Sequence, residues 1–268
     1  DYAEALATRA QLQLDLGNYA EAETDLSRLL DPLSCRNGVF AWRALARIGL
    51  GRSEAAVEDW LRLTDEPFES SELYRAPENL LAVGNLPDTS AGNICAAFLH
   101  LLARRPGAVE LANRAVQEQP NDGRWRWLRA EILERSGQLE AAREDYAVVL
   151  SLKSDAGDAS RRLAWCTLRA GRAQEALVVF QEQPDDLDAR LGRASAELAL
   201  AGSKVDPLEA LLGRLDELVN SELAAPAQAL RGEALHRLGR PVEALQAYHE
   251  SLRLSPSVQL LTLLGFAR

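Results

Sequence analysis

Small and aromatic side chains recur along the chain at helical spacing, with charged residues between them and glycines where the pattern breaks. The stretch APAQALRGEALHRLGRPVEALQAYHESLRLSP, residues 225–256, shows this most completely. Gly232 and Ala244 are small enough for two helices to approach closely, and Tyr248 can fill the gap toward a neighbouring pair of helices. Gly239 can adopt the left-handed conformation that ends a helix. The pattern therefore predicts two packed α-helices joined at Gly239.

Glycines recur at predicted helix ends along the whole chain. They are Gly17, Gly51, Gly137, Gly171, Gly202 and Gly239. The gaps between them are 34, 86, 34, 31 and 37 residues. An irregular member at Ala103 divides the gap of 86 into 52 and 34, and 31 and 37 sum to twice 34. The period is therefore 34 residues, with one insertion of 18 residues.

This repeat resembles the tetratricopeptide repeat (TPR). Counted from Ala225 as position 1, the small residues fall at positions 8, 15 and 20, Tyr248 at position 24 and Pro256 at position 32, as in the family. Position 20 is also alanine in five other repeats, at Ala22, Ala56, Ala108, Ala142 and Ala176, and position 24 is aromatic at Trp60, Tyr146 and Phe180. The resemblance implies an all-α fold, a TPR-type solenoid in which antiparallel helix pairs form a superhelix.

We expect residues 1–268 to form a single solenoid of about seven repeats. These are residues 3–36, 37–67, 89–122, 123–156, 157–187, 188–224 and 225–256, followed by a C-terminal helix at 257–268. The insertion lies around residues 68–88. Its stretch PENLLAVG predicts a short helix after Pro77 that plugs a widened joint, and a functional loop is the alternative.

Composition and charge exclude several classes of protein. The net charge of −10 and the pI near 5.0 argue against broad nucleic-acid binding, which needs a basic surface. No run of about 18 apolar residues is present, so we expect no membrane span. Cys35, Cys95 and Cys166 are scattered and form no CxxC pair, which indicates buried, reduced thiols and a cytoplasmic location. The chain contains no methionine, which indicates a segment of a longer chain or a processed product.

Motifs for catalysis or for metal binding are absent from the sequence. No GxSxG, HExxH, Walker A or GxGxxG pattern occurs. His100, His236 and His249 accompany no nucleophile motif, and no histidine–cysteine cluster has ligand spacing. We therefore expect no enzymatic activity, no cofactor and no metal.

The stretch GRWRWLRAEILERSG, residues 123–137, combines two tryptophans with several arginines. The TPR resemblance implies that positions 2, 5, 9, 12 and 13 of a first helix line the concave face. In this repeat those positions are Arg124, Trp127, Glu131, Glu134 and Arg135. Trp125 lies about 200° around the helix from Trp127, so one ring should face the groove and the other should pack inward.

The next repeat extends this predicted groove. Arg161, Trp165 and Arg169 are four residues apart and share one helical face. We expect Trp127 and Trp165 to lie on adjacent helices of one groove, bracketed by arginines. Residues 123–175 carry a net charge of +2, so we expect this groove to be locally positive. This suits an acidic or C-terminal peptide. The alternative is that the rings only pack over neighbouring helices and that the arginines pair with Glu131, Glu134 or Asp158.

The sequence thus predicts a non-enzymatic scaffold that binds a peptide or protein segment in its concave groove. The predicted partner-binding residues are Arg124, Trp127, Glu131, Arg135, Arg161, Trp165 and Arg169. The carboxylate clamp of TPR proteins that bind chaperone tails needs asparagine at position 9, which never occurs here, so that subtype is excluded. The alternative function is a regulatory or sensor region of a larger protein whose effector domain (kinase, protease or NTPase) lies outside this sequence. The sequence does not determine the oligomeric state.

Overall fold

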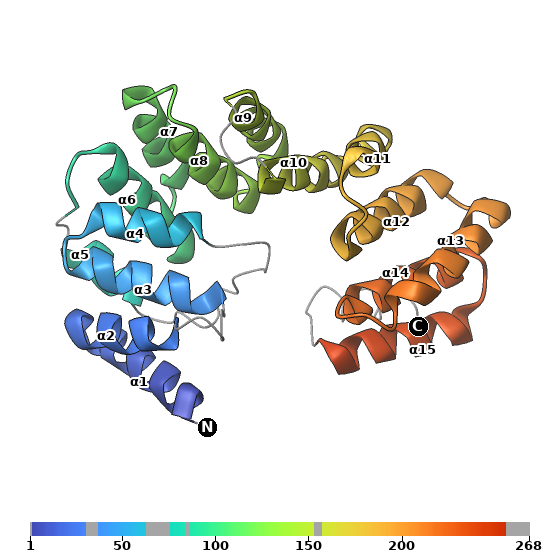
Figure 1. The fold of residues 1–268 in the computed structure, drawn as a ribbon, viewed down its shortest axis with the longest axis horizontal. Helices are drawn as coiled ribbons and strands as arrows, with labels where there is room; N and C mark the ends of the chain where they lie inside the picture. The colour runs from blue at the N-terminus through green and yellow to red at the C-terminus, as the bar shows by residue number, and fades with distance from the viewer. Residues whose placement is uncertain (1, 31–36, 63–75, 84–85, 153–156, 256–268) are drawn as a thin grey trace. The chain divides into compact units, whose positions relative to one another are not determined.

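The computed structural model describes residues 2–30, 37–62, 76–83, 86–152 and 157–255. In these ranges all regular secondary structure is α-helical (Figure 1). The helices are α1 (Tyr2–Leu16), α2 (Tyr19–Leu29), α3 (Asn37–Gly49), α4 (Ser53–Leu61), α5 (Ala76–Val83), α6 (Ser90–Leu102), α7 (Ala108–Glu118), α8 (Gly123–Arg135), α9 (Leu139–Ser151), α10 (Gly157–Arg169), α11 (Ala173–Glu182), α12 (Leu187–Ala201), α13 (Val205–Leu218), α14 (Ala224–Arg237) and α15 (Pro241–Leu254).

Consecutive helices pack as antiparallel pairs, which confirms the predicted all-α fold of TPR type. The chain divides into two compact units, an N-terminal unit of residues 1–154 and a C-terminal unit of residues 155–268. The N-terminal unit contains the pairs α1/α2, α3/α4, α6/α7 and α8/α9, and the C-terminal unit contains α10/α11, α12/α13 and α14/α15. Because each unit is described by itself, one continuous solenoid stays a prediction, as do the exact repeat boundaries. The expected helix at 257–268 lies outside the described residues.

In the described pairs, the first helix ends at a residue with positive φ. The six glycines of the 34-residue period all have positive φ, as expected for residues that end a first helix. In the third pair this residue is Arg104, with φ 52°, one position after Ala103, where the period had placed the irregular member. The next N–H, of Arg105, donates to the His100 carbonyl at 2.8 Å, as it does in a glycine-closed helix end. The first helix of this pair therefore ends without glycine, although an L-residue is strained in this conformation, and Gly107, with φ 97°, follows as the N-cap of α7.

Aromatic side chains fill the space between helices, as the repeat pattern predicts. Trp60, Tyr146, Phe180 and Tyr248 are all fully buried. Trp60 of α4 stacks on Phe98 of α6 at 4.4 Å between ring centroids, so it joins one pair to the next. Trp60 therefore belongs to the core, and Trp42 is buried as well.

The described part of the insertion contains one short helix, α5, where the sequence predicts a helix after Pro77. Pro77 and Leu80 are buried, and α5 packs against α3 and α6. Asn79 also donates to the Asp15 carbonyl of α1 at 3.3 Å. The rest of the insertion lies mostly outside the described residues, so its function stays open.

Cys95 and Cys166 are buried and form no disulfide, as expected, whereas Cys35 lies outside the described residues. Within the part of the chain that the structure describes, none of the helices has the length and apolar character needed to cross a bilayer.

Candidate partner-binding surface

Three helix pairs of the N-terminal unit contain the same arginine–aspartate ion pair between their two helices. An arginine of the first helix binds an aspartate that lies 16 residues later, in the second helix; the pairs are Arg9–Asp25, Arg43–Asp59 and Arg129–Asp145. Each guanidinium donates from Nε and Nη2 to the two carboxylate oxygens at 2.6–3.0 Å, and all three aspartates are buried. Such bidentate pairs fix orientation as well as distance. The spacing Arg-x15-Asp is present in the sequence, but these ion pairs were not predicted from it.

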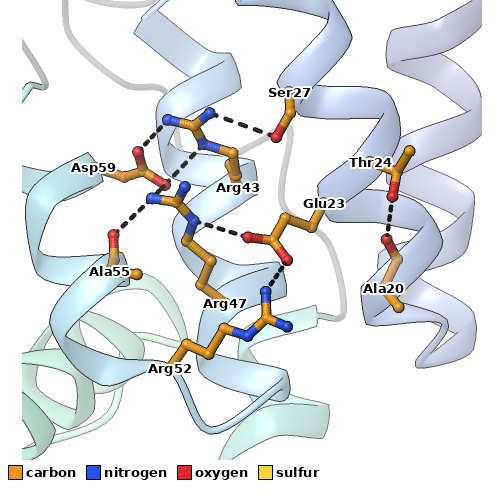
Figure 2. Close-up of polar contacts among 9 residues, drawn as sticks. All are labelled: Ala20, Glu23, Thr24, Ser27, Arg43, Arg47, Arg52, Ala55 and Asp59. Carbon is orange, nitrogen blue, oxygen red and sulfur yellow. Dashed lines mark hydrogen bonds and ion pairs between the residues drawn. The ribbon is translucent and has the colours of Figure 1, made fainter.

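The Arg43–Asp59 pair continues into a network with α2 (Figure 2). Arg47 donates to Asp59 and to the Ala55 carbonyl, each at 2.8 Å. Its Nε also donates to Glu23 of α2 at 3.1 Å, and Arg52 donates to the second oxygen of Glu23 at 2.7 Å. The network therefore connects α2 of the first helix pair to α3 and α4 of the second.

The start of α8 is organised by an aspartate. Asp122 caps the helix by accepting from the Arg124 backbone N–H at 2.9 Å, and it pairs with the Arg124 guanidinium at 2.7 Å. The hydrogen bond from Arg124 lowers the pKa of the Asp122 carboxyl below its ordinary value, although burial opposes the shift. Trp125 is buried and donates to Gln119 at 3.1 Å, so it is the ring of the GRWRW stretch that packs inward.

Trp127 is half-buried and packs edge-on against Tyr146 of α9, with ring centroids 5.4 Å apart. The Tyr146 hydroxyl lies 3.1 Å from an oxygen of Glu131 and 3.1 Å from an oxygen of Glu134. Both glutamates are buried, and Glu131 also accepts from Arg135 at 2.7 Å. Glu131 and Glu134 therefore hold the tyrosine and the arginine of this surface in place.

On α10, Trp165 packs edge-on against Phe180 of α11, with ring centroids 5.1 Å apart. Its indole Nε1 donates to Asp188 Oδ2, in the first turn of α12, at 3.2 Å. Arg161 Nε lies 3.4 Å from the same oxygen, and Arg161 Nη2 lies 3.4 Å from Asp186, the N-cap of α12. Two groups of the predicted binding set thus converge on one carboxylate.

A repeated triad explains why α10 differs from other first helices. In α14/α15 the Tyr248 hydroxyl donates to Glu233 at 3.0 Å, and Arg237 donates to the same glutamate at 2.7 Å. The α8/α9 pair has the same three residue types in contact, Tyr146, Glu131 and Arg135. Burial and the negative charge of Glu233 raise the pKa of the Tyr248 hydroxyl well above its ordinary value. In α10/α11 the tyrosine is replaced by Phe180 and the glutamate by Trp165. The hydroxyl and the carboxylate are lost together, which leaves the indole N–H to bind Asp188.

A cavity of about 300 Å³ opens between α7, α8 and α9. Leu133 and Val148 contribute apolar wall, and Arg126, Arg129 and Asp145 contribute a polar wall. The two arginines already bind Asp145, and Arg126 also donates to the Pro120 carbonyl at 2.9 Å. The cavity uses a different face of α8 from the predicted binding residues.

The predicted binding residues fall into two sets. Arg124, Trp127, Glu131 and Arg135 lie on α8 in the N-terminal unit, and Arg161, Trp165 and Arg169 lie on α10 in the C-terminal unit. The structure describes the units separately, so the single groove holding both tryptophans stays a prediction. Asp188 belongs to the α10 set by contact, and no sequence signal pointed to it. Among the described residues, no group of three or more His, Cys, Asp or Glu side chains could hold a metal ion.

Two segments of the chain, residues 102–156 and 207–258, match the family model described as Tetratricopeptide repeat. These segments contain the pairs α8/α9 and α14/α15 whole, the two pairs that carry the tyrosine–glutamate–arginine triad. No curated protein sequence matches the chain.

Several solved structures share the fold. A tetratricopeptide repeat protein from Parabacteroides merdae ATCC 43184 is 16% identical with a TM-score of 0.58, over 99% of this chain and 98% of that chain. The crystal structure of the APC/C hetero-tetramer Cut9–Hcn1 contains a chain that is 14% identical with a TM-score of 0.54; the match covers 98% of this chain but only 48% of that one. TTC0263, a thermophilic TPR protein of Thermus thermophilus, is 18% identical with a TM-score of 0.51, over 66% of this chain and 98% of that chain. At these identities the likeness shows the fold alone.

Proposed function

We propose that the chain is a non-enzymatic scaffold of the tetratricopeptide repeat type, whose family model matches residues 102–156 and 207–258, and that it binds a protein or peptide segment on its first helices. Stacked repeats present such helices as an extended surface, which is the general use of this architecture. The proposal needs no catalytic group, cofactor or metal.

The observation that carries the proposal is the α10 surface. Trp165 is only half-buried, although its ring packs on Phe180, and its indole N–H points to a partly exposed carboxylate. Tryptophan and arginine are the residue types that most often dominate binding energy at interfaces. Arg161 and Arg169 flank Trp165 one helical turn away on each side.

We propose that the partner segment carries acidic groups. The α10 helix contains Arg161, Arg162 and Arg169 in a chain whose net charge is −10. Guanidinium groups bind carboxylates with directional hydrogen bonds, so this arginine-bearing helix complements an acidic segment. Trp127, Arg124 and Arg135 on α8 form a second candidate contact, in which Glu131 positions Arg135.

The test compares three tryptophan substitutions in the whole chain. Trp165→Ala should weaken binding of an acidic peptide by about 30-fold, because interface tryptophans typically contribute about 2 kcal/mol or more. Trp127→Ala should weaken binding if α8 takes part in the same contact. Trp60→Ala should instead lower stability by about 3–5 kcal/mol, because Trp60 is a core residue.

Thermal melting and peptide affinity, measured side by side, separate the two outcomes. If Trp165→Ala melts as early as Trp60→Ala, Trp165 is a packing residue and the proposed surface is wrong. Arg161→Ala should weaken binding more at low salt than at high salt, because screening already reduces an exposed charge interaction.

A further inference from the structure

Trp165 and Arg161 converge on a carboxylate of the chain itself. The oxygen Asp188 Oδ2 lies 3.2 Å from the indole nitrogen and 3.4 Å from Arg161 Nε. We propose that Asp188 occupies, in the free protein, the position that a carboxylate of an acidic partner takes on binding. This inference rests on the proposed function and adds its mechanism: the α10 surface is a carboxylate site that the chain itself fills, and Asp188 sets its affinity.

The contacts of Asp188 with Trp165 and Arg161 are of the kind that a ligand can replace. Its distances of 3.2–3.4 Å exceed the 2.6 Å of the shortest contact in the buried Arg43–Asp59 pair. The side chains of Arg161 and Asp188 remain 29% and 30% exposed, whereas those of Arg43 and Asp59 are 11% and 1% exposed. Exposed ion pairs at such distances contribute little, at most about a factor of five in an equilibrium.

The Asp188 carboxylate can also turn away from Trp165 and Arg161 without disrupting α12. It lies in the first turn of α12, where the backbone N–H groups and the helix dipole stabilise a negative charge. Asp186 caps that helix by accepting from the Ala189 N–H at 2.8 Å, so α12 keeps its cap when Asp188 turns away. The carboxylate of Asp188 can therefore return to water without unfolding the helix start.

The recognising groups select the chemistry of the ligand. The indole N–H and the guanidinium of Arg161 are donors without acceptor capacity, so the ligand must supply an acceptor. A carboxylate matches both donors and complements the positive charge, as Asp188 itself demonstrates. The Trp165 indole N–H and the Arg161 guanidinium therefore favour an aspartate or glutamate side chain of a partner segment.

The experiment measures the affinity of the whole chain for an acetylated, amidated hexaglutamate peptide, which offers only side-chain carboxylates. We expect Asp188→Ala to bind this peptide about three- to fivefold more tightly than the wild-type chain, because the internal competitor is removed. Asp188→Asn should give a smaller gain, because asparagine still accepts from the indole N–H but no longer pairs with Arg161.

A matched control removes the same charge elsewhere in the C-terminal unit. Glu182 is exposed at the end of α11, and Glu182→Gln changes the net charge as Asp188→Asn does. Glu182→Gln should leave the affinity unchanged if the gain comes from vacating the site rather than from reduced repulsion of an acidic peptide. Adding Trp165→Phe, which removes the indole N–H, should shrink the gain from Asp188→Ala, since the two changes act on one site.

The Trp165 indole resonance, assigned by its loss in Trp165→Phe, gives a second readout. Saturating peptide and Asp188→Ala should each shift this resonance, and Glu182→Gln should not. If wild type binds through Trp165 but Asp188→Ala binds equally or more weakly, the self-occupied site is refuted and the proposed function stands. If neither chain binds the peptide and the resonance does not move, the acidic partner and the self-occupied site are both refuted.

Discussion

In two first helices, the residue at position 9 forms an ion pair with the arginine four residues later. It is Glu131 in α8 and Glu233 in α14, and each glutamate holds the following arginine at 2.7 Å. In α10 the same position is Trp165, so Arg169 has no glutamate four residues before it in the sequence. The residue at position 9 thus distinguishes the α8 and α14 repeats, which form this glutamate–arginine pair, from the α10 repeat, which carries Trp165 there.

At the same scale, burial should make Cys95 chemically inert. Burial raises the pKa of the Cys95 thiol to about 12, and the thiolate is the reactive form. We expect iodoacetamide to modify Cys95 in the native chain at pH 8 far more slowly than in the urea-unfolded chain, with modification located by mass spectrometry. Equal rates in the two states would show that Cys95 is exposed.

The raised pKa also predicts the direction of a pH effect on stability. The unfolded thiol releases its proton near 9.0, and the folded thiol keeps it to about pH 12. The contribution of Cys95 is therefore fully present below pH 9 and is lost as pH rises toward 12. The urea midpoint should fall more between pH 8 and pH 10.5 in the wild-type chain than in Cys95→Ala, where this group is absent.

Among the helices, the repeated arginine–aspartate pairs offer an internal comparison. Asp59→Ala leaves the guanidinium groups of Arg43 and Arg47 without their buried carboxylate, and removing one partner of a buried pair costs about 3–5 kcal/mol. Asp25→Ala should cost much less, because the Arg9 side chain is 56% exposed and returns to water. Urea denaturation of both variants checks this ranking.

Replacing both residues of the Arg43–Asp59 pair shows whether the ion pair itself is needed, or only side chains that fill its space. Replacing Arg43 and Asp59 together with apolar residues of similar volume should recover most of the loss from Asp59→Ala, because the Arg43 guanidinium is then gone and Arg47 keeps its contacts with Glu23 and the Ala55 carbonyl. A double variant as unstable as the single one would show that the ion pair itself is needed to hold α3 on α4.

Two glycines in helix interiors should respond in opposite ways to alanine. A Cβ on Gly232 would lie 2.7 Å from the Tyr248 ring, whereas a Cβ on Gly213 of α13 would meet nothing within 4 Å. Gly213→Ala should therefore stabilise the chain by about 0.5–1 kcal/mol through helix propensity. Gly232→Ala should destabilise it by about 1–3 kcal/mol through overpacking. Melting temperatures that move in the same direction would contradict this reading of α14/α15.

Over the whole molecule, the effects of such changes should stay local. In repeat proteins each unit contacts mainly its neighbours, so stability is close to a sum of nearest-neighbour terms. We expect Gly232→Ala to raise amide hydrogen exchange in α14, α15 and the adjoining α12 and α13, and to leave α1–α4 unchanged. A uniform rise across the described helices would mean that the chain unfolds as one cooperative block.

The sequence by itself determined the helix pairs and their core. Helix ends at Gly17, Gly51 or Gly239 depend on a local backbone conformation that glycine adopts without strain, so residue identity and spacing were sufficient. The burial of Trp60 and Tyr248 follows from their place in a periodic pattern. Arg104 departs from the glycine pattern, because the surrounding helix pair tolerates one strained residue. The local sequence does not indicate that an arginine takes this conformation.

Only the tertiary structure decided which polar groups meet. Arg43 and Asp59 belong to different helices, as do Trp165 and Asp188, so these contacts depend on how the helices pack. Packing against a neighbouring helix also decides that Glu131 and Glu134 are buried. Helical periodicity assigns a residue to a face, but the distance between two faces depends on how the small and aromatic residues beneath them pack. For this reason the sequence could indicate Arg161 and Trp165 as candidate binding residues but could not identify Asp188, whose carboxylate both of them contact.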